Sequence, residues 1–148
     1  MEILLVEDTP ADAELAQIAL RRCAYAGTLT HLPDGERAIE WLERRDSGVG
    51  GEAATLPHVV LLDLKMPRVD GHDVLRHVKG SARLKRLPVV VFTSSREERD
   101  IARAYELGAN SYVVKPVEFG AYCAAMAEIV KYWAQRSERP PYAWLEPA

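Results

Sequence analysis

The sequence predicts an α/β domain in which helices cover both faces of a five-stranded parallel sheet. Apolar segments alternate with helix-like segments along the whole chain, and most of the apolar segments are continuous runs. Continuous apolar strands are typical of sheets that are buried on both faces. The βαβ rhythm therefore predicts a doubly wound fold, and a length of 148 residues suits one domain with a sizeable core.

Most of the predicted strands are short apolar runs that stop at a polar residue. The first is Ile3-Leu4-Leu5-Val6, and the central one is His58-Val59-Val60-Leu61-Leu62. We expect strands at residues 2–7, 28–32, 58–63, 88–93 and 111–114.

The helices between these strands carry recognisable start and stop signals. Thr9 precedes Pro10 as a helix cap precedes a proline at the first helical position. Asp34 and Gly35 open the second helix, and Gly108 ends the fourth as a left-handed cap. We expect helices from residue 10 to about 24, from 35 to a glycine-rich loop at 46–57, and over 72–79, 96–107 and 118–136.

The composition narrows the class of protein. Hydrophobic residues make up 48% and charged residues 28%, which indicates a folded globular chain. The net charge of −3 gives no basic footprint for nucleic acid, and no apolar run approaches the roughly 18 residues of a membrane helix. Two cysteines, Cys23 and Cys123, do not make a disulfide framework. We expect a cytoplasmic protein that binds neither nucleic acid nor membranes.

Polar side chains stand where four of the strands end. Glu7 and Asp8 follow the first strand, Asp63 ends the central one, and Thr93 and Lys115 end the last two. In doubly wound folds the ligand lies beyond the carboxyl ends of the strands. We therefore expect these residues to converge on one edge of the sheet.

Three acids at one site repel each other, and a hard divalent cation such as Mg²⁺ would neutralise them. Lys115 offers a positive charge and Thr93 a hydroxyl for phosphate oxygens. These parts suit phosphoryl transfer onto Asp63. A cis peptide bond at Pro116 could aim Lys115 inward. Taken singly, Asp8 could be a helix cap, Lys115 a surface lysine and Thr93 an ordinary strand residue.

Three other classes of protein stay open at this point. A hydrolase that works through an aspartyl phosphate would typically need a second acid two residues after Asp63, where this chain has Lys65. A nucleotide-binding module would need a glycine-rich loop after the first strand, where this chain has Glu7-Asp8-Thr9-Pro10. A scaffold that docks partners without phosphorylation is the third.

The ordered set of motifs resembles the receiver domain of two-component response regulators over about residues 2–136. The residues that carry the resemblance are Glu7-Asp8, Asp63, Met66-Pro67, Asp70-Gly71, Thr93-Ser94, Gly108-Ala109 and Lys115-Pro116. The resemblance implies a flavodoxin-like (βα)5 fold with strand order 2-1-3-4-5. It also implies that the chain is a regulator rather than an enzyme with an external substrate.

The same resemblance assigns roles to single residues. Asp63 would accept a phosphoryl group from a histidine of a sensor kinase. Asp8, Asp63 and the backbone carbonyl of Lys65 would bind Mg²⁺, and Glu7 would act largely through water. Thr93 and Lys115 would read the phosphate.

Tyr112 stands at the family's aromatic switch position, although it could also be an ordinary strand tyrosine. In the family, Thr93 and Tyr112 move on phosphorylation, and the surface of the fourth helix, fifth strand and fifth helix changes partners. Lys65 and Ser95 stand at positions that tune the access of water to the phosphate.

The long loop and the tail resemble the small single-domain regulators that accompany bacterial phytochrome kinases. We expect a receiver domain at residues 1–137 and an extended arm at 138–148, with no output domain. The chain could also pass its phosphoryl group to a histidine phosphotransfer protein, or act as a sink.

The last helix and the arm suggest a homodimer. The helix carries an apolar stripe that we expect to face mainly the core, and the arm contains two prolines and several large apolar residues. Aromatic residues are enriched at interfaces, although the arm could also fold back on its own domain. The candidate dimer residues are Tyr122, Trp133, Tyr142, Trp144 and Leu145.

Overall fold

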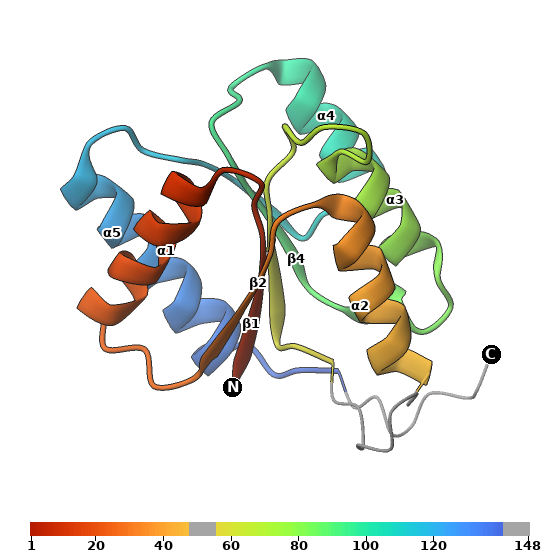
Figure 1. Ribbon diagram of the computed structural model, residues 1–148, viewed down its shortest axis with the longest axis horizontal. Helices are drawn as coiled ribbons and strands as arrows, with labels where there is room; N and C mark the ends of the chain where they lie inside the picture. Colours follow the sequence, from red (N-terminus) through yellow and green to blue (C-terminus); the bar gives the residue numbers. More distant parts are fainter. Residues whose placement is uncertain (48–55, 141–148) are drawn as a thin grey trace.

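The computed structural model describes residues 1–47 and 56–140, and these form a parallel sheet with helices on both faces (Figure 1). The strand order is β2-β1-β3-β4-β5, and every neighbouring pair is parallel. This confirms the predicted fold class and strand order. The strands are β1 (Glu2–Val6), β2 (Thr28–Leu32), β3 (Val59–Leu62), β4 (Val89–Thr93) and β5 (Ser111–Val114).

The helices divide between the two faces of the sheet. Helices α1 and α5 pack together on one face, and α2 and α3 pack together on the other, with α4 beside α3 (Figure 1). Their bounds are α1 (Pro10–Arg22), α2 (Gly35–Ser47), α3 (Gly71–Gly80), α4 (Glu98–Glu106) and α5 (Phe119–Ile129), with a short 3-10 helix η1 (Leu84–Arg86).

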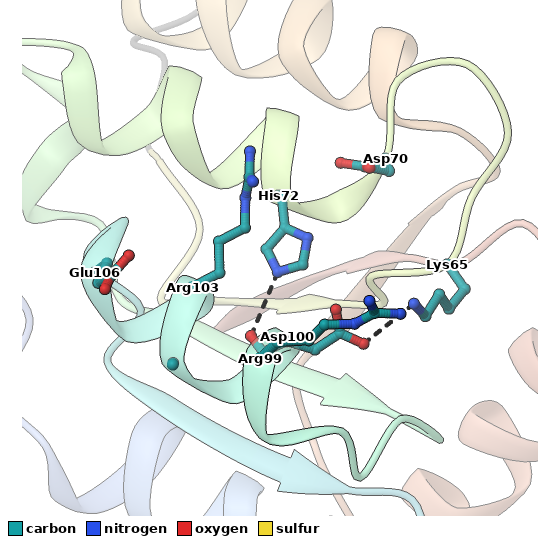
Figure 2. Close-up of a pocket in the computed structure, with 8 residues that line it drawn as sticks. Lys65, Asp70, His72, Arg99, Asp100, Arg103 and Glu106 are labelled. Carbon is teal, nitrogen blue, oxygen red and sulfur yellow. Dashed lines mark hydrogen bonds and ion pairs between the residues drawn. The ribbon is translucent and has the colours of Figure 1, made fainter.

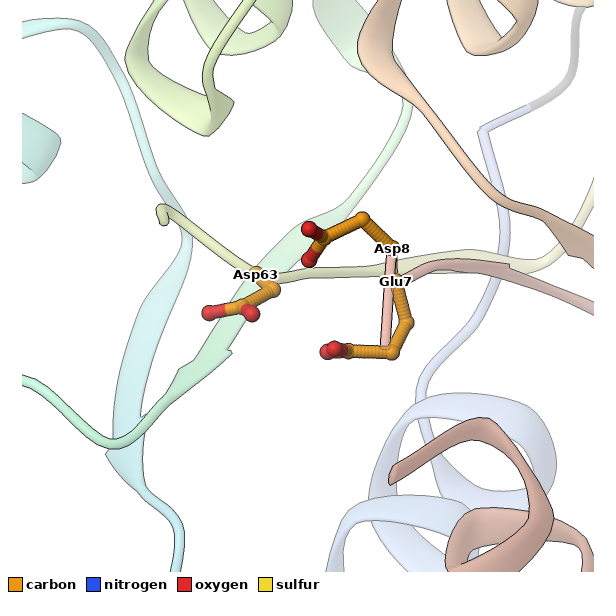
Figure 3. Close-up of side chains that lie close together, drawn as sticks. All are labelled: Glu7, Asp8 and Asp63. Atoms are coloured by element: carbon orange, nitrogen blue, oxygen red, sulfur yellow. The ribbon is translucent and has the colours of Figure 1, made fainter. Parts of the chain in front are cut away.

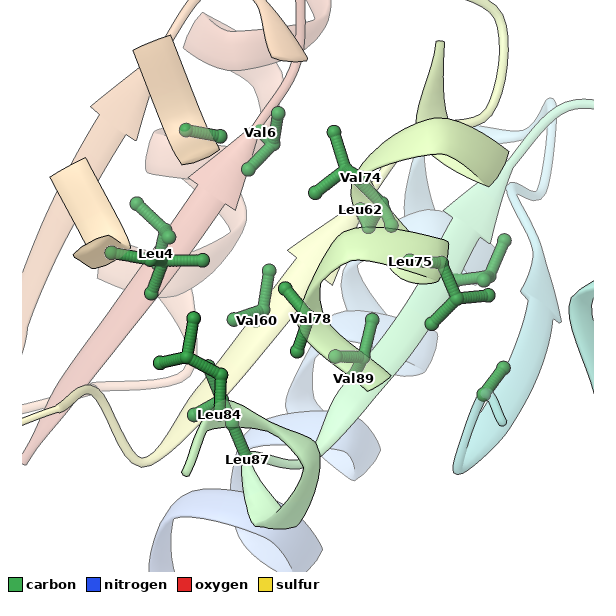
Figure 4. Close-up of a cluster of buried hydrophobic side chains, with 14 of the residues drawn as sticks. Leu4, Val6, Val60, Leu62, Val74, Leu75, Val78, Leu84, Leu87 and Val89 are labelled. Atoms are coloured by element: carbon green, nitrogen blue, oxygen red, sulfur yellow. The ribbon is translucent and has the colours of Figure 1, made fainter. Parts of the chain in front are cut away.

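Alternate residues of the inner strands supply two separate cores. In β1, Leu4 and Val6 face the α2–α3 side, while Ile3 and Leu5 face the α1–α5 side. Figure 4 shows the first core, where side chains of β1, β3 and α3 interdigitate. Each fully buried leucine or valine contributes about 1.5–3 kcal/mol of hydrophobic free energy. Burial on both faces fixes the strand register, and with it the places where the strands end.

The helix ends follow the predicted signals. Pro10 opens α1 after Thr9, and Gly108 has a φ of 101° just beyond α4. Asp70 caps α3 through a reciprocal capping box with Asp73. Both cysteines are free. None of the helices within residues 1–47 and 56–140 is long and apolar enough to cross a membrane.

Two expectations about single residues were wrong. No described peptide bond is cis, so the bond before Pro116 is trans, the usual state of such bonds. The Lys115 side chain reaches inward without it. Tyr122, a candidate dimer residue, is only 3% exposed and packs on Phe92 of its own chain, with ring centroids 5.4 Å apart. Its ring belongs to the core because it stands on the inward face of α5.

The end of the chain differs in part from the predicted continuous helix. After Ile129 the α-helix widens into a π-helix, η2 (Val130–Arg136), in which the Ser137 amide donates to the Tyr132 carbonyl five residues back. Trp133 is half-buried against the α1–α5 core. Arg139 donates a hydrogen bond of 2.8 Å to the carbonyl of Leu56. Tyr142, Trp144 and Leu145 lie outside the described residues.

Candidate functional site

The three predicted acids meet at the carboxyl edge of the sheet. Because β1 and β3 are hydrogen-bonded neighbours in parallel register, the residues that follow them lie side by side. Glu7, Asp8 and Asp63 each place a carboxylate oxygen within 4.8 Å of the other two (Figure 3). Glu7 and Asp63 are buried and Asp8 is half-buried, so solvent screens their repulsion poorly.

Lys115 is the counter-charge of this cluster. Its ammonium nitrogen lies 2.8 Å from Glu7 Oε2 and 3.7 Å from Asp63 Oδ2. The end of β5 brings it there, since the Lys115 amide donates to the carbonyl of Thr93 at the end of β4. Burial alone would lower the pKa of Lys115, but the Glu7 hydrogen bond and the nearby carboxylates raise that pKa above its usual value.

One ammonium does not balance the acids of the site. Burial raises the pKa of Glu7 to about 7, and the charge of Asp63 adds to this effect while Lys115 opposes it. Three carboxylates stand against one ammonium, so the site carries excess negative charge. A hard cation with oxygen ligands, of which Mg²⁺ is the usual example, fits a group of carboxylates so close together.

Thr93 supplies a donor that is already desolvated. Its side chain is fully buried, and its hydroxyl finds no hydrogen-bond partner among the described residues. Buried polar groups in folded proteins are nearly always paired, and an unpaired one costs free energy. This hydroxyl at the end of β4 can therefore donate to a ligand of the site.

Gly71 allows α3 to begin directly against Asp63. A Cβ atom at this position would overlap the carbonyl oxygen of Asp63 and would come within 2.7 Å of Leu64 Cα. The Gly71 amide also donates to the Leu64 carbonyl at 3.0 Å. The loop that carries Lys65 is thus fixed at both ends.

Comparison with known sequences gives the same result along the chain. Residues 3–127 match the response regulator receiver domain family. The chain belongs to this family. It is 41% identical over 138 residues to the probable methanogenesis regulatory protein FilR2 of Methanothrix harundinacea, with 93% of this chain and 86% of that protein covered. It is 36% identical to the response regulator Rcp1 of Synechocystis, with 93% and 92% covered.

Solved structures of receivers superpose on nearly the whole chain. The phosphorylated cyanobacterial phytochrome response regulator RcpA has a TM-score of 0.83 at 34% identity, covering 94% of this chain and 97% of that one. The Mn²⁺-bound form of Rcp1 has a TM-score of 0.82 at 36% identity, covering 94% and 98%. The bacteriophytochrome response regulator AtBRR is 47% identical, with a TM-score of 0.71, covering 93% and 97%.

A second group of contacts ties Tyr112 and Ser95 to α4. The Tyr112 hydroxyl donates to the Ser95 carbonyl at 2.9 Å, and the Ser95 hydroxyl donates to Asp100 at 2.6 Å. Asp100 also pairs with Lys65 at 3.1 Å (Figure 2). The hydrogen bond from Ser95, together with Lys65, holds the pKa of Asp100 below its usual value. Lys65 comes two residues after Asp63, and Ser95 comes two residues after Thr93. Both therefore bind the same buried carboxylate, that of Asp100.

Asp100 lines an open pocket of about 610 Å³ between the loop after β3 and α4. Figure 2 shows the His72 ring of α3 directed at the backbone carbonyl of Asp100, at 3.4 Å from Nε2. That the Lys65 carbonyl binds the cation stays a prediction.

Sequence reasoning missed three side chains near the site. Asp12 of α1 lies 3.3 Å from the Lys115 ammonium, and Asp100 holds Lys65. His31 of β2 places Nε2 2.7 Å from the Glu7 carbonyl, while the Glu7 amide donates to the Leu32 carbonyl at 3.1 Å. A weak signal existed only for Asp12, an acid four residues after Asp8 in the opening turn of the helix.

Proposed function

We propose that this receiver domain accepts a phosphoryl group on Asp63 from a phosphohistidine of a partner kinase. The observation that carries the proposal is the cluster of Glu7, Asp8 and Asp63, of which Glu7 and Asp63 pair with the Lys115 ammonium. Thr93, whose hydroxyl has no partner among the described residues, ends the neighbouring strand β4. Such a site neutralises and positions a transferring phosphoryl group, which is most of what this reaction needs.

In the proposed transfer an Asp63 carboxylate oxygen attacks phosphorus. The phosphorus–nitrogen bond of the phosphohistidine breaks, and its electron pair returns to the imidazole nitrogen. The phosphoryl oxygens stay on phosphorus, where Lys115 and Thr93 donate to them. Asp8, Asp63 and the Lys65 carbonyl would hold Mg²⁺, with Glu7 acting through water. The bound cation would offset the negative charge of donor and acceptor.

The readout of phosphorylation would travel through the contacts of Thr93 and Tyr112. A dianionic group on Asp63 draws the Thr93 hydroxyl toward it, and Ser95 lies on the same loop. Because the Tyr112 hydroxyl is bonded to the Ser95 carbonyl, a shift of this loop would carry Tyr112 inward with it. The surface formed by α4, β5 and α5, with Tyr105 half-exposed on α4, would then change partners.

A phytochrome-type histidine kinase is the partner that the comparisons favour. The similarity to RcpA and to AtBRR supports this pairing. FilR2, a methanogenesis regulator by its name, matches equally well in coverage. A kinase of another input, or a histidine phosphotransfer protein in a relay, is therefore the second candidate. Timed phosphotransfer from a panel of purified kinases would separate them, since the cognate kinase transfers fastest.

The first test is phosphorylation without a kinase. With acetyl phosphate and Mg²⁺, we expect the intact mass to rise by one phosphoryl group. Asp63→Asn should abolish the gain, because no carboxylate remains as nucleophile, and chelation of Mg²⁺ should also suppress it. Asp34→Asn, which changes a surface acid at the start of α2, is the control. Equal phosphorylation of Asp63→Asn would place the acceptor elsewhere. No gain in mass in any form of the protein, together with no binding of beryllofluoride, would favour a docking scaffold.

A further inference from the structure

The Lys115 ammonium has three carboxylate neighbours, and one of them comes from outside the predicted site. Glu7 Oε2 lies 2.8 Å away, Asp12 Oδ2 3.3 Å and Asp63 Oδ2 3.7 Å. Asp12 stands in the first turn of α1, so it reaches Lys115 from the helix that packs beside α5. Of the three acids, the phosphoacceptor is the one that lies farthest from the ammonium.

The burial of the three partners differs. The side chain of Glu7 is 2% exposed, that of Asp63 9% and that of Asp12 40%, around a Lys115 side chain that is 9% exposed. Asp12 therefore closes the solvent side of a nearly buried ammonium. An opposite charge at hydrogen-bond distance in such a setting holds the ammonium toward itself.

We propose that Asp12 is a positioning residue that holds Lys115 on the α1 side and competes with the phosphoryl group for its ammonium. The inference rests on the proposed function, because it concerns the residue that would read the phosphate. When Asp63 is phosphorylated, Lys115 must leave Asp12 in part to donate to a phosphoryl oxygen. The negative charge of Asp12 also repels the phosphoryl group and attracts the cation.

The proposal predicts effects of opposite sign on two ligands. In Asp12→Asn the shape of the side chain is kept and its charge is lost. Affinity for Mg²⁺ should fall, and affinity for beryllofluoride at saturating Mg²⁺ should rise, each by roughly twofold to fivefold, as for a partly exposed ion pair. Calorimetric titration of the full chain measures both. If Asp12 has a purely structural role, the substitution should lower the affinity for both ligands, and this result would overturn the proposal.

Glu14→Gln is the matched control, because it removes the same charge from the exposed side of the same helix. An equal response of Glu14→Gln would show a general effect of charge and would overturn the specific pairing. In a Lys115→Met background, Asp12→Asn should no longer tighten beryllofluoride, since the group through which it acts is absent. Tightening that persists there would also overturn the proposal.

Thermal unfolding of the unliganded protein keeps this inference separate from the proposed function. The shifts in Tm from Asp12→Asn and Lys115→Met should be non-additive, because each removes the same ion pair. Additive shifts would overturn the pairing even if the protein is phosphorylated normally. Failure of the wild-type protein to bind Mg²⁺ or beryllofluoride would reject the proposed function, while the additivity of the shifts would still decide the pairing.

Discussion

Thr93 shows, in a single residue, how function opposes stability. Its buried hydroxyl has no partner within residues 1–47 and 56–140, and such a group costs about 1–2 kcal/mol relative to an apolar group of the same shape. We expect Thr93→Val to raise the free energy of unfolding by about that amount in urea titration. We expect the same variant to bind beryllofluoride more weakly, because valine cannot donate to it.

Thr30→Val is the matched control for this prediction. The Thr30 hydroxyl donates to Glu2 at 2.8 Å, on β2, so its loss should destabilise the fold by about 1 kcal/mol. Beryllofluoride affinity should not change in this variant. A Thr93→Val protein that is less stable than the wild type would show that the hydroxyl is satisfied in solution and would remove the argument.

The residues that the sequence could predict are those whose place follows from strand ends. Glu7, Asp63 and Lys115 each follow a strand directly, and Asp8 comes one residue after Glu7. Parallel strands bring their ends to one edge. Asp12, His31 and Asp100 reach the site or its loops by the packing of a helix or of a side chain from another strand. These contacts depend on how distant segments pack together, and the local sequence does not predict that packing.

At the scale of elements, the start of α3 sets the shape of the loop after Asp63. Gly71→Ala would press a Cβ atom against the backbone of Asp63 and Leu64. Backbone gives way less than a side chain, so we expect a loss of about 1–3 kcal/mol in the free energy of unfolding. The displaced loop should also weaken Mg²⁺ binding, which calorimetry would detect.

Gly80→Ala tests whether this effect belongs to the site rather than to the helix. Gly80 ends the same helix, and a Cβ atom there would meet nothing within 4 Å. Alanine should therefore stabilise α3, by up to about 1 kcal/mol, and should leave Mg²⁺ affinity unchanged. Similar losses in both variants would mean that α3 as a whole, rather than its contact with Asp63, controls the site.

Element order and the bounds of the inner strands were predictable because burial on both faces leaves continuous apolar runs. The buried strand Val89–Thr93 agrees with its predicted range of 88–93 to within one residue. The widening of the last helix after Ile129 was not predictable, since the residues that follow keep a helical apolar pattern. The isomer of the Lys115–Pro116 bond also left no mark in the sequence.

At the scale of the whole molecule, the Asp100 carboxylate on α4 connects the loop after Asp63 with Ser95 and Tyr112. Asp100 accepts from Ser95 and pairs with Lys65, and Ser95 in turn accepts from Tyr112. In the proposed switch, these contacts form a short route from Asp63 to the α4–β5–α5 face. At the opposite end of the sheet, Arg139 near the start of the arm donates a hydrogen bond to the carbonyl of Leu56.

The arm is the part of the molecule on which the proposed homodimer depends. Tyr122 is buried in its own core, so the dimer candidates that remain are the half-buried Trp133 and the residues of the arm. We expect the full chain to sediment as a dimer and a chain that ends at Ser137 to sediment as a monomer. Arg139→Ala in the full chain should lower the Tm slightly and keep the dimer, because its hydrogen bond to the carbonyl of Leu56 lies within the same chain. A truncated chain that remains dimeric would contradict a role for the arm. A monomeric full chain whose Tm falls on truncation would show that the arm packs on its own domain.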